Sequence, residues 1–291
     1  MKYATPNAFR TALEARLKNL ARESGLSVGR LRKTVAFEVF LQRLLHVAPE
    51  QWVLKGALAL EFRIGARSRS TLDVDLAGWD KPDDVTAVLL AAQSRDAEDS
   101  FRLRIDRIDR EPGWDTIRYR ILVELAGREF ETIAVDVGVS DSQLWPPQSR
   151  SSPGLLEFAG IPARKIPVQA PEQQVAEKLH AYTRVYSDAR RSSRTKDLID
   201  LCLIARNESL EAGRLNQAIA VTFERRRTQE VPIQFPEAPE WWERQFAALA
   251  QEVGITPDLA SAHRLVASML DPVLEGRSQG AWDPSRMSWV E

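Results

Sequence analysis

Two aspartates separated by one residue lie in the short apolar segment Leu72-Asp73-Val74-Asp75-Leu76. Side chains alternate between faces in an extended strand, so the three apolar residues are expected to point into a core. Asp73 and Asp75 then project together from the other face. Two carboxylates in one small volume repel each other unless a cation lies between them, and hard oxygen ligands suit Mg²⁺ or Mn²⁺. The segment therefore predicts a divalent-metal site of the kind that handles a nucleoside triphosphate.

A third aspartate occurs in a second segment of the same type, residues 133–139. The branched apolar residues take one face of the expected strand, and Asp136 lies on the other face between small neighbours that leave room for a ligand. A lone acid inside such a strand is expensive to bury without a partner. We therefore expect Asp73, Asp75 and Asp136 to share the metal ion.

Groups suited to phosphate binding flank the aspartate pair. Gly56 stands where an apolar run leads into an expected helix, and a glycine there lets backbone N–H groups approach a phosphate closely. The alternative for Gly56 is a tight turn that packs Leu54 against Leu58, and the alternative for the basic residues is a solvated face. The expected phosphate-binding residues are Lys55, Gly56, Ala57, Arg69, Ser70, Thr71, Lys178 and Lys196.

Two later helical segments carry the remaining charged candidates. In the expected helix after Pro171, Lys178 lies on the edge of an apolar stripe, where it either snorkels past the core or holds a triphosphate. In residues 194–201, Asp197 and Asp200 lie one turn apart beside the core stripe. We expect them to orient Lys178 or other basic groups, and the alternative is a capped helix start that faces solvent.

The elements that position these residues follow from apolar spacing and turn signals. Helices are expected from Pro6 to before Gly25, from about Ser27 to Leu45, and at about 83–93. Strands are expected at 72–76 and 101–108, and as a hairpin of 116–125 with 130–139. The order predicts an α/β (α+β) fold with an N-terminal helical segment at 1–48, a mixed core at 49–168 and a helical domain at 169–291, interrupted near 232–239.

Composition limits the class of protein. The chain has 291 residues, 44% of them hydrophobic and 28% charged, which suits one large or two modest domains. A net charge of −1 argues against a protein that coats nucleic acid but allows a local basic groove. The single cysteine, Cys202, excludes an internal disulfide and a cysteine-cluster zinc site. We expect no signal peptide and no membrane span, so the cytoplasm is the expected location.

Basic clusters in the helical half suit an RNA end. They are Arg225-Arg226-Arg227 and Arg190-Arg191 with Arg194, and Trp241-Trp242 offers aromatic surface nearby in sequence. Core packing is the alternative explanation of the tryptophans.

Taken together and in order, residues 55–60, 69–76, 177–178 and 194–201 resemble the AbiEii/AbiGii-type nucleotidyltransferase toxins. The resemblance covers roughly residues 50 to 205. It implies a polymerase-β-like nucleotidyltransferase core with a helical C-terminal portion, in a type IV-like toxin–antitoxin or abortive-infection system. Mycobacterial relatives of this type add nucleotides to the 3′ end of tRNA and so stop translation.

The resemblance also implies roles for individual residues. It makes Asp73 and Asp75 the metal-binding acids, Lys178 a cation on the triphosphate, and Asp197 or Asp200 the later essential acid. The strand pattern adds Asp136 to this set.

The sequence departs from the family pattern at one point. Many relatives have Gly-Gly or Gly-Ser/Thr where this chain has Gly56-Ala57, so the usual hydroxyl is missing. Phosphate contact there depends on the backbone, or on Ser68, Ser70 or Thr71. A hydroxyl at Ser70 or Thr71 is also a candidate for inhibitory phosphorylation, because a dianion beside the carboxylates would repel the triphosphate.

The expected function is Mg²⁺- or Mn²⁺-dependent transfer of a nucleoside monophosphate from an NTP to RNA, with the 3′ end of tRNA as the favoured acceptor. The expected partners are the NTP, the RNA and a cognate antitoxin that is a kinase or a transcriptional repressor, with no membrane. The alternatives are transfer to a small molecule such as an aminoglycoside, transfer to a protein hydroxyl, and a catalytically silent scaffold that binds nucleic acid or a partner.

Overall fold

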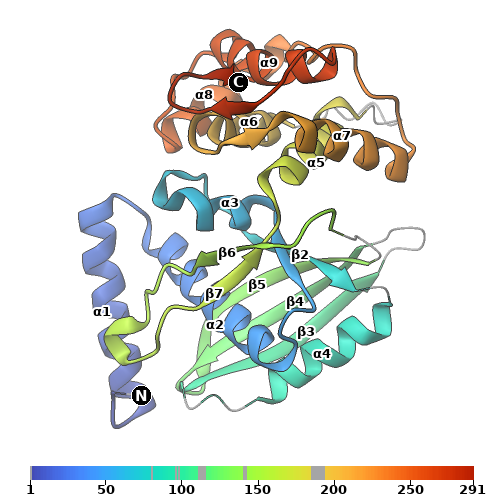
Figure 1. The fold of residues 1–291 in the computed structure, drawn as a ribbon. Coiled ribbons are helices and arrows are strands. Elements are labelled where there is room, and N and C mark those ends of the chain that lie inside the picture. The colour runs from blue at the N-terminus through green and yellow to red at the C-terminus, as the bar shows by residue number, and fades with distance from the viewer. Residues whose placement is uncertain are drawn as a thin grey trace. The chain divides into compact units, whose positions relative to one another are not determined.

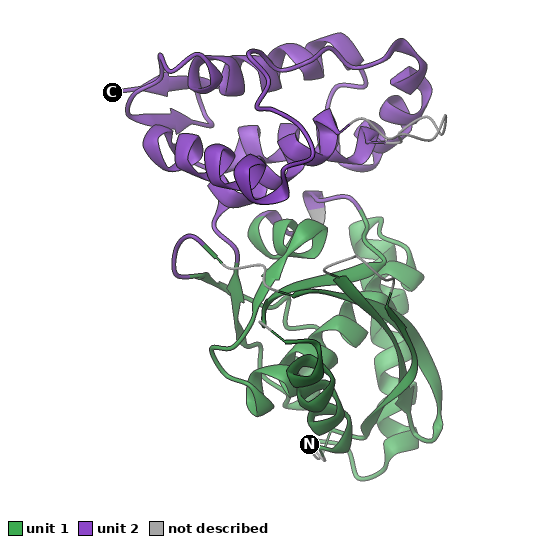
Figure 2. Cartoon of the chain, turned by 90° about the vertical axis from the view of Figure 1, so that its right-hand side faces the viewer, with its two compact units in different colours: residues 1–63, 70–143, 147–168 green, residues 64–69, 144–146, 169–291 purple. Residues whose placement is uncertain are grey.

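The structure is a computed structural model that describes residues 2–79, 81–95, 97, 99–110, 116–139, 143–184 and 194–291. Contacts within the chain divide it into two compact units, which Figure 2 shows in separate colours. Unit 1 comprises residues 1–63, 70–143 and 147–168. Unit 2 comprises residues 64–69, 144–146 and 169–291.

Two long helices open unit 1 at the positions that the sequence predicts. They are α1 (Pro6–Ser24) and α2 (Val28–Val47). The side chains of Thr5 and Ser27 each accept a backbone N–H bond from the first turn, so both are N-caps. Gly25 ends α1 with φ +74°, a left-handed conformation that glycine adopts without strain.

The described part of unit 1 contains a seven-stranded mixed sheet in the order β3-β4-β5-β2-β1-β7-β6 (Figure 1). Its strands are β1 (Val53–Lys55), β2 (Asp73–Trp79), β3 (Phe101–Arg110), β4 (Thr116–Leu125), β5 (Arg128–Val139), β6 (Gln148–Ser151) and β7 (Lys165–Val168). Strands β4 and β5 form the predicted antiparallel hairpin, and β2 runs parallel to β5. The other elements of unit 1 are α3 (Gly56–Ile64), α4 (Pro82–Ser94) and η2 (Glu157–Ala159). The short helix η1 (Gly65–Arg67) follows α3 along the chain and belongs to unit 2.

Helices α2 and α4 pack on the apolar face of this sheet (Figure 1). Val74, Leu76 and Val135 are fully buried there, as the alternating pattern predicts. The prediction was wrong for Leu72, which is 67% exposed. Strand β2 begins only at Asp73, so Leu72 precedes the sheet and the alternation does not apply to it.

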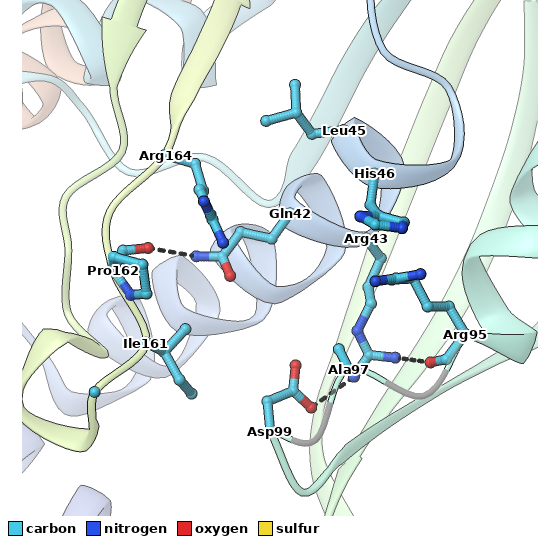
Figure 3. A pocket seen from close by; sticks show the side chains of 11 residues that line it. Gln42, Arg43, Leu45, His46, Arg95, Ala97, Asp99, Ile161, Pro162 and Arg164 are labelled. Carbon is cyan, nitrogen blue, oxygen red and sulfur yellow. Dashed lines mark hydrogen bonds and ion pairs between the residues drawn. The ribbon is translucent and has the colours of Figure 1, made fainter. Parts of the chain in front are cut away.

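A pocket of about 370 Å³ lies beside the C-terminal half of α2 (Figure 3). Arg164 and Arg95 approach it from opposite sides. Arg43, which also lines the pocket, is buried and hydrogen-bonded to its neighbours. The guanidinium of Arg43 donates to the carbonyl oxygen of Arg95, to Oδ1 of Asp99 at 2.6 Å and to the carbonyl oxygen of Phe101 at 3.0 Å. Arg43 therefore joins α2 to the connection between α4 and β3.

Unit 2 is mainly helical, as predicted. Its helices are α5 (Pro171–Thr183), α6 (Thr195–Asn207), α7 (Ala212–Arg226), η3 (Glu240–Trp242), α8 (Glu243–Glu252) and α9 (Leu259–Leu274). The predicted interruption near 232–239 lies between α7 and η3. Arg190 and Arg191 lie outside the described residues. No helix among the described residues has the length and apolar character needed to cross a membrane.

The sequence does not predict the small antiparallel sheet of unit 2. It consists of β8 (Leu210–Glu211), β9 (Ala281–Asp283) and β10 (Ser288–Val290). Strands this short are not long enough to show a period of two. The sheet is held in place by Trp282, which is fully buried and donates its Nε1–H to the carbonyl oxygen of Ala205 at 2.7 Å.

Candidate active site

The strand register of unit 1 brings the three predicted metal ligands together. Asp75 on β2 lies directly across from Asp136 on β5, and Asp73 lies across from Ala134. Residues two apart on a strand share a face, so the three carboxylates lie on one face of the sheet. This is the face opposite the buried core, and all three side chains are partly exposed.

Arg118 supplies a positive charge to this cluster. It lies across from Asp136 on β4, and its Nε and Nη2 donate to the two Asp136 oxygens at 2.7 and 2.6 Å. Its Nη2 is 4.0 Å from Oδ2 of Asp73. The hydrogen bonds to Asp136 raise the pKa of Arg118 above its ordinary value, and the charges of Asp73 and Asp75 add to this rise, against desolvation that lowers it. Arg118 is a site residue that the sequence analysis missed.

The donor chemistry of the cluster fits a divalent metal in part. Asp73 and Asp75 provide hard oxygen donors on one face, which is what Mg²⁺ or Mn²⁺ requires. Asp136 forms a two-point ion pair with Arg118, so both of its carboxylate oxygens already have a partner. Among the described residues, no group of three or more His, Cys, Asp or Glu side chains is arranged to hold a metal ion.

The backbone at Gly56 approaches the cluster closely. Strand β1 ends at Lys55, which pairs with Asp75, and Gly56 begins α3 with φ +67°. A Cβ atom on Gly56 would lie 2.7 Å from Cγ of Asp75 and would collide with its Oδ2. Only glycine fits this turn. Leu54 and Leu58 on either side are fully buried, so the turn also anchors the core.

The remaining phosphate-binding candidates of unit 1 lie around this turn and before β2. Ala57 is buried in the first turn of α3, and Lys55 is half-buried. Ser70 is exposed. The hydroxyl of Thr71 accepts a hydrogen bond from the backbone N–H of Asp73 at 3.4 Å, so it helps to begin β2.

Unit 2 contains a buried cluster of opposite charges. Nζ of Lys178 on α5 lies 2.6 Å from Oδ2 of Asp200 and 3.7 Å from Oδ1 of Asp197. Arg69 donates to both oxygens of Asp200 at 2.9 and 2.8 Å. The contacts that the helical spacing predicts between these aspartates and Lys178 are present. Asp200 is fully buried, so the alternative of a solvent-facing helix start is wrong for it, and Lys196 is the exposed member of this segment.

The two cations determine the charge state of Asp200. Burial by itself raises the pKa of this carboxyl, but Lys178 and Arg69 outweigh burial and hold the pKa below its ordinary value. Asp200 is therefore an ionised carboxylate inside unit 2, and its two partners are oriented by it.

The aromatic and basic candidates for RNA contact differ in exposure. Trp242 is buried edge-on against Tyr182, so core packing explains it, whereas Trp241 is 43% exposed. Arg226 lies 3.5 Å from Glu177.

The candidate residues thus form two groups, each described within its own unit. In unit 1 they are Asp73, Asp75 and Asp136 with the turn at Lys55, Gly56 and Ala57, and with Ser70 and Thr71. In unit 2 they are Arg69, Lys178, Lys196, Asp197 and Asp200.

Comparison with known families identifies the family of this chain. The model of the nucleotidyl transferase AbiEii toxin family, of type IV toxin–antitoxin systems, matches residues 39–277. The chain belongs to this family. The resemblance seen in the sequence is confirmed. No curated protein is similar enough to the chain to count as a match.

One solved structure shows the fold of this AbiEii-family chain. MenT4, a nucleotidyltransferase toxin from Mycobacterium tuberculosis, has a TM-score of 0.58 and 18% identity, over 90% of this chain and 98% of MenT4. A putative nucleotidyltransferase from Helicobacter pylori has a TM-score of 0.49 and 15% identity, over 87% of this chain and 97% of that protein. The likeness to MenT4 confirms the predicted fold class.

Replacing Gly56 tests the close approach to Asp75. Gly56→Ala in this AbiEii-family chain is expected to lower the free energy of unfolding by at least about 1 kcal/mol more than Gly25→Ala. Gly25 has a similar φ of +74° but nothing within 4 Å of an added Cβ, so it controls for backbone strain alone. Urea unfolding of both variants gives the comparison. Equal losses would contradict a collision with Asp75.

Replacing Asp200 tests the buried charge cluster. Its folded-state pKa lies below the unfolded value, so its contribution to stability is present above about pH 4 and is lost as pH falls through the folded pKa. Asp200→Asn is expected to lose about 3–5 kcal/mol at neutral pH, because Arg69 and Lys178 lose the buried carboxylate that contacts both of them. It is also expected to show a flatter fall in stability below about pH 4. Urea unfolding across pH, with Asp197→Asn as control, measures both, and parallel pH profiles of wild type and Asp200→Asn would contradict the assignment.

Proposed function

We propose that this chain transfers a nucleoside monophosphate from an NTP to an RNA acceptor, the 3′ end of tRNA, and thereby blocks translation. Family membership supplies the nucleotidyltransferase activity and the toxin role. The observation that carries the proposal is the register of β2 and β5, which sets Asp73, Asp75 and Asp136 side by side against the Gly56 turn. This arrangement suits an anionic substrate that arrives with a divalent cation.

The chemistry would divide among the residues of unit 1. Asp73 and Asp75 would hold Mg²⁺ or Mn²⁺, which when bound neutralises charge on the triphosphate and on the attacking oxygen. Once the ion pair between Arg118 and Asp136 opens, Asp136 would orient the acceptor hydroxyl for in-line attack on the α-phosphorus. The new phosphodiester bond forms as the bond to the β-phosphate breaks, and pyrophosphate leaves. Backbone N–H groups at the Gly56 turn donate to phosphate oxygens.

The roles of the unit 2 residues stay predictions from the family resemblance. Lys178 and Lys196 are proposed contacts of the triphosphate. Burial of Asp200 with two cations supports a positioning role for it, because a carboxylate without exposed surface cannot itself take up a metal ion with its hydration shell.

A toxin of this family has an antitoxin partner. We propose that the antitoxin is a kinase that acts at Ser70 or Thr71, with transcriptional repression as the alternative. Ser70 is exposed, and the Thr71 hydroxyl bonds to the backbone of Asp73, so a phosphate on Thr71 would lie next to Asp73 and one on Ser70 would lie three residues before it. Mass spectrometry of the toxin coexpressed with its antitoxin is expected to show a gain of one phosphate on this pair. A silenced but unmodified toxin would overturn the kinase proposal.

Replacing Asp75 tests the proposed activity. Asp75→Asn removes one metal-binding charge at nearly constant volume, so it is expected to abolish transfer of label from an α-³²P nucleotide to bulk tRNA without unfolding the chain. Asp84→Asn, an exposed carboxylate on α4, is the matched control and is expected to retain transfer. Circular dichroism checks the fold of both.

The same assay separates the alternatives. If label appears on protein or on an aminoglycoside and not on RNA, the acceptor is a protein hydroxyl or a small molecule. Full growth inhibition by Asp75→Asn would instead favour the catalytically silent scaffold.

A further inference from the structure

Exposed arginines continue the carboxylate face of the unit 1 sheet across β4 and β3. Their side chains are half or more exposed, with fractions of 57% for Arg104, 69% for Arg107, 54% for Arg118 and 60% for Arg120. Arg118 and Arg120 are two residues apart on β4, so both share the face of Asp136. We call Arg104, Arg107 and Arg120 the arginine row.

A β-bulge in β3 places Arg107 on this face. Ile105 pairs with Ile121 and Arg107 pairs with Arg120, so Asp106 is an extra residue without its own partner. Strict alternation would send Arg107 to the apolar face together with Ile105. The bulge keeps both Asp106 and Arg107 on the carboxylate face, where Asp106 contacts Arg120 at 3.6 Å.

The register gives the distance between the row and the carboxylates. Across the sheet, one line of paired residues is Asp75, Asp136, Arg118 and Asp109, and the next is Asp73, Ala134, Arg120 and Arg107. Strands are about 4.8 Å apart, so Arg107 lies three spacings, about 14 Å, from Asp73. Arg120 is one spacing nearer. The row therefore begins beside the carboxylates and extends to the edge of the sheet.

Each arginine of the row contacts an aspartate, but three arginines share two aspartates. Arg104 and Arg120 lie 3.5 and 3.6 Å from Asp106, and Arg107 lies 2.6 Å from Asp109. Ion pairs at this exposure contribute at most about 1 kcal/mol each, so a phosphate can replace the aspartate at little expense. The planar guanidinium binds phosphate oxygens in pairs, which a lysine cannot do.

We propose that the arginine row binds the backbone phosphates of a single-stranded RNA 3′ segment, so that the terminal hydroxyl reaches the carboxylates. Charge complementarity selects this occupant, because an RNA strand that approaches three carboxylates needs positive charge along its path. The contacts read phosphates and not base edges, so binding is insensitive to base sequence. The inference rests on the proposed function for its acceptor.

RNA binding without nucleotide or metal tests the row separately from catalysis. The triple variant Arg104→Gln, Arg107→Gln, Arg120→Gln is expected to bind a labelled short single-stranded RNA at least about tenfold more weakly, in fluorescence anisotropy at low salt. The slope of log affinity against log salt is expected to fall in magnitude by about 2, since each phosphate contact on a single strand contributes about 0.7.

Three arginines of unit 2 provide a matched control. Arg264, Arg277 and Arg286 are 69%, 66% and 72% exposed, and each is also paired with an acid. Their triple Gln variant removes the same charge, so it is expected to bind RNA with the wild-type salt slope. Urea unfolding confirms that both variants are folded. Equal weakening by both would show a general charge effect and overturn the proposal.

The outcomes also separate this inference from the proposed function. If Asp75→Asn abolishes transfer to RNA while the row variant binds RNA like wild type, the proposed function stands and the arginine row is overturned. If wild type transfers nothing to RNA but the row variant alone loses RNA binding, the proposed function fails and the row stands as an RNA-binding surface.

Discussion

Three carboxylates that repel one another share one face of the unit 1 sheet. Asp73, Asp75 and Asp136 lie on one sheet face because β2 and β5 are parallel neighbours in a fixed register. Such a cluster persists only with positive charge beside it, and here Arg118 provides that charge through two hydrogen bonds to Asp136. The Gly56 turn completes the arrangement, because any larger residue would displace Asp75. Arg118 therefore offsets part of the negative charge at this site, through a side chain that is half exposed.

In unit 2 the carboxylate of Asp200 is neutralised by cations in the interior and not at the surface. Asp200 is fully buried, and Lys178 and Arg69 contact it at 2.6 to 2.9 Å, so this cluster is closed to solvent on the carboxylate side. Removing one partner of such a cluster leaves a buried charge unpaired, which destabilises a fold strongly. A loss of activity in an Asp200 variant would therefore be explained by lost stability, which does not apply to the partly exposed Asp75. Asp75 is partly exposed on a sheet face, whereas Asp200 is buried in an ion-pair cluster.

Strands β4 and β3 add positively charged side chains to the same sheet face as the carboxylates. A bulge at Asp106 keeps consecutive polar residues on one side, so arginines on two strands line the same surface. A sheet edge is normally protected against pairing with another chain by charged side chains, and the arginines of β3 also serve that purpose. One set of residues can therefore prevent aggregation and attract an anionic polymer.

Local spacing in the sequence was enough to predict the first two helix caps, the hairpin and the buried face of 133–139. It also placed Asp197 and Asp200 one turn apart, but it left open which basic groups they contact, and the packing of α5 on α6 brings Lys178 to them. Local spacing could not place Arg118. Counting pairs back from the turn at Gly127 sets Arg118 opposite Val135, on the buried face, whereas a register shift between Val123 and Glu124 sets it opposite Asp136. A shift of one residue exchanges the two faces of a strand, and only packing in three dimensions decides whether it occurs. The start of β2 was missed for a similar reason. The alternating pattern includes Leu72, but pairing with the neighbouring strands begins only at Asp73.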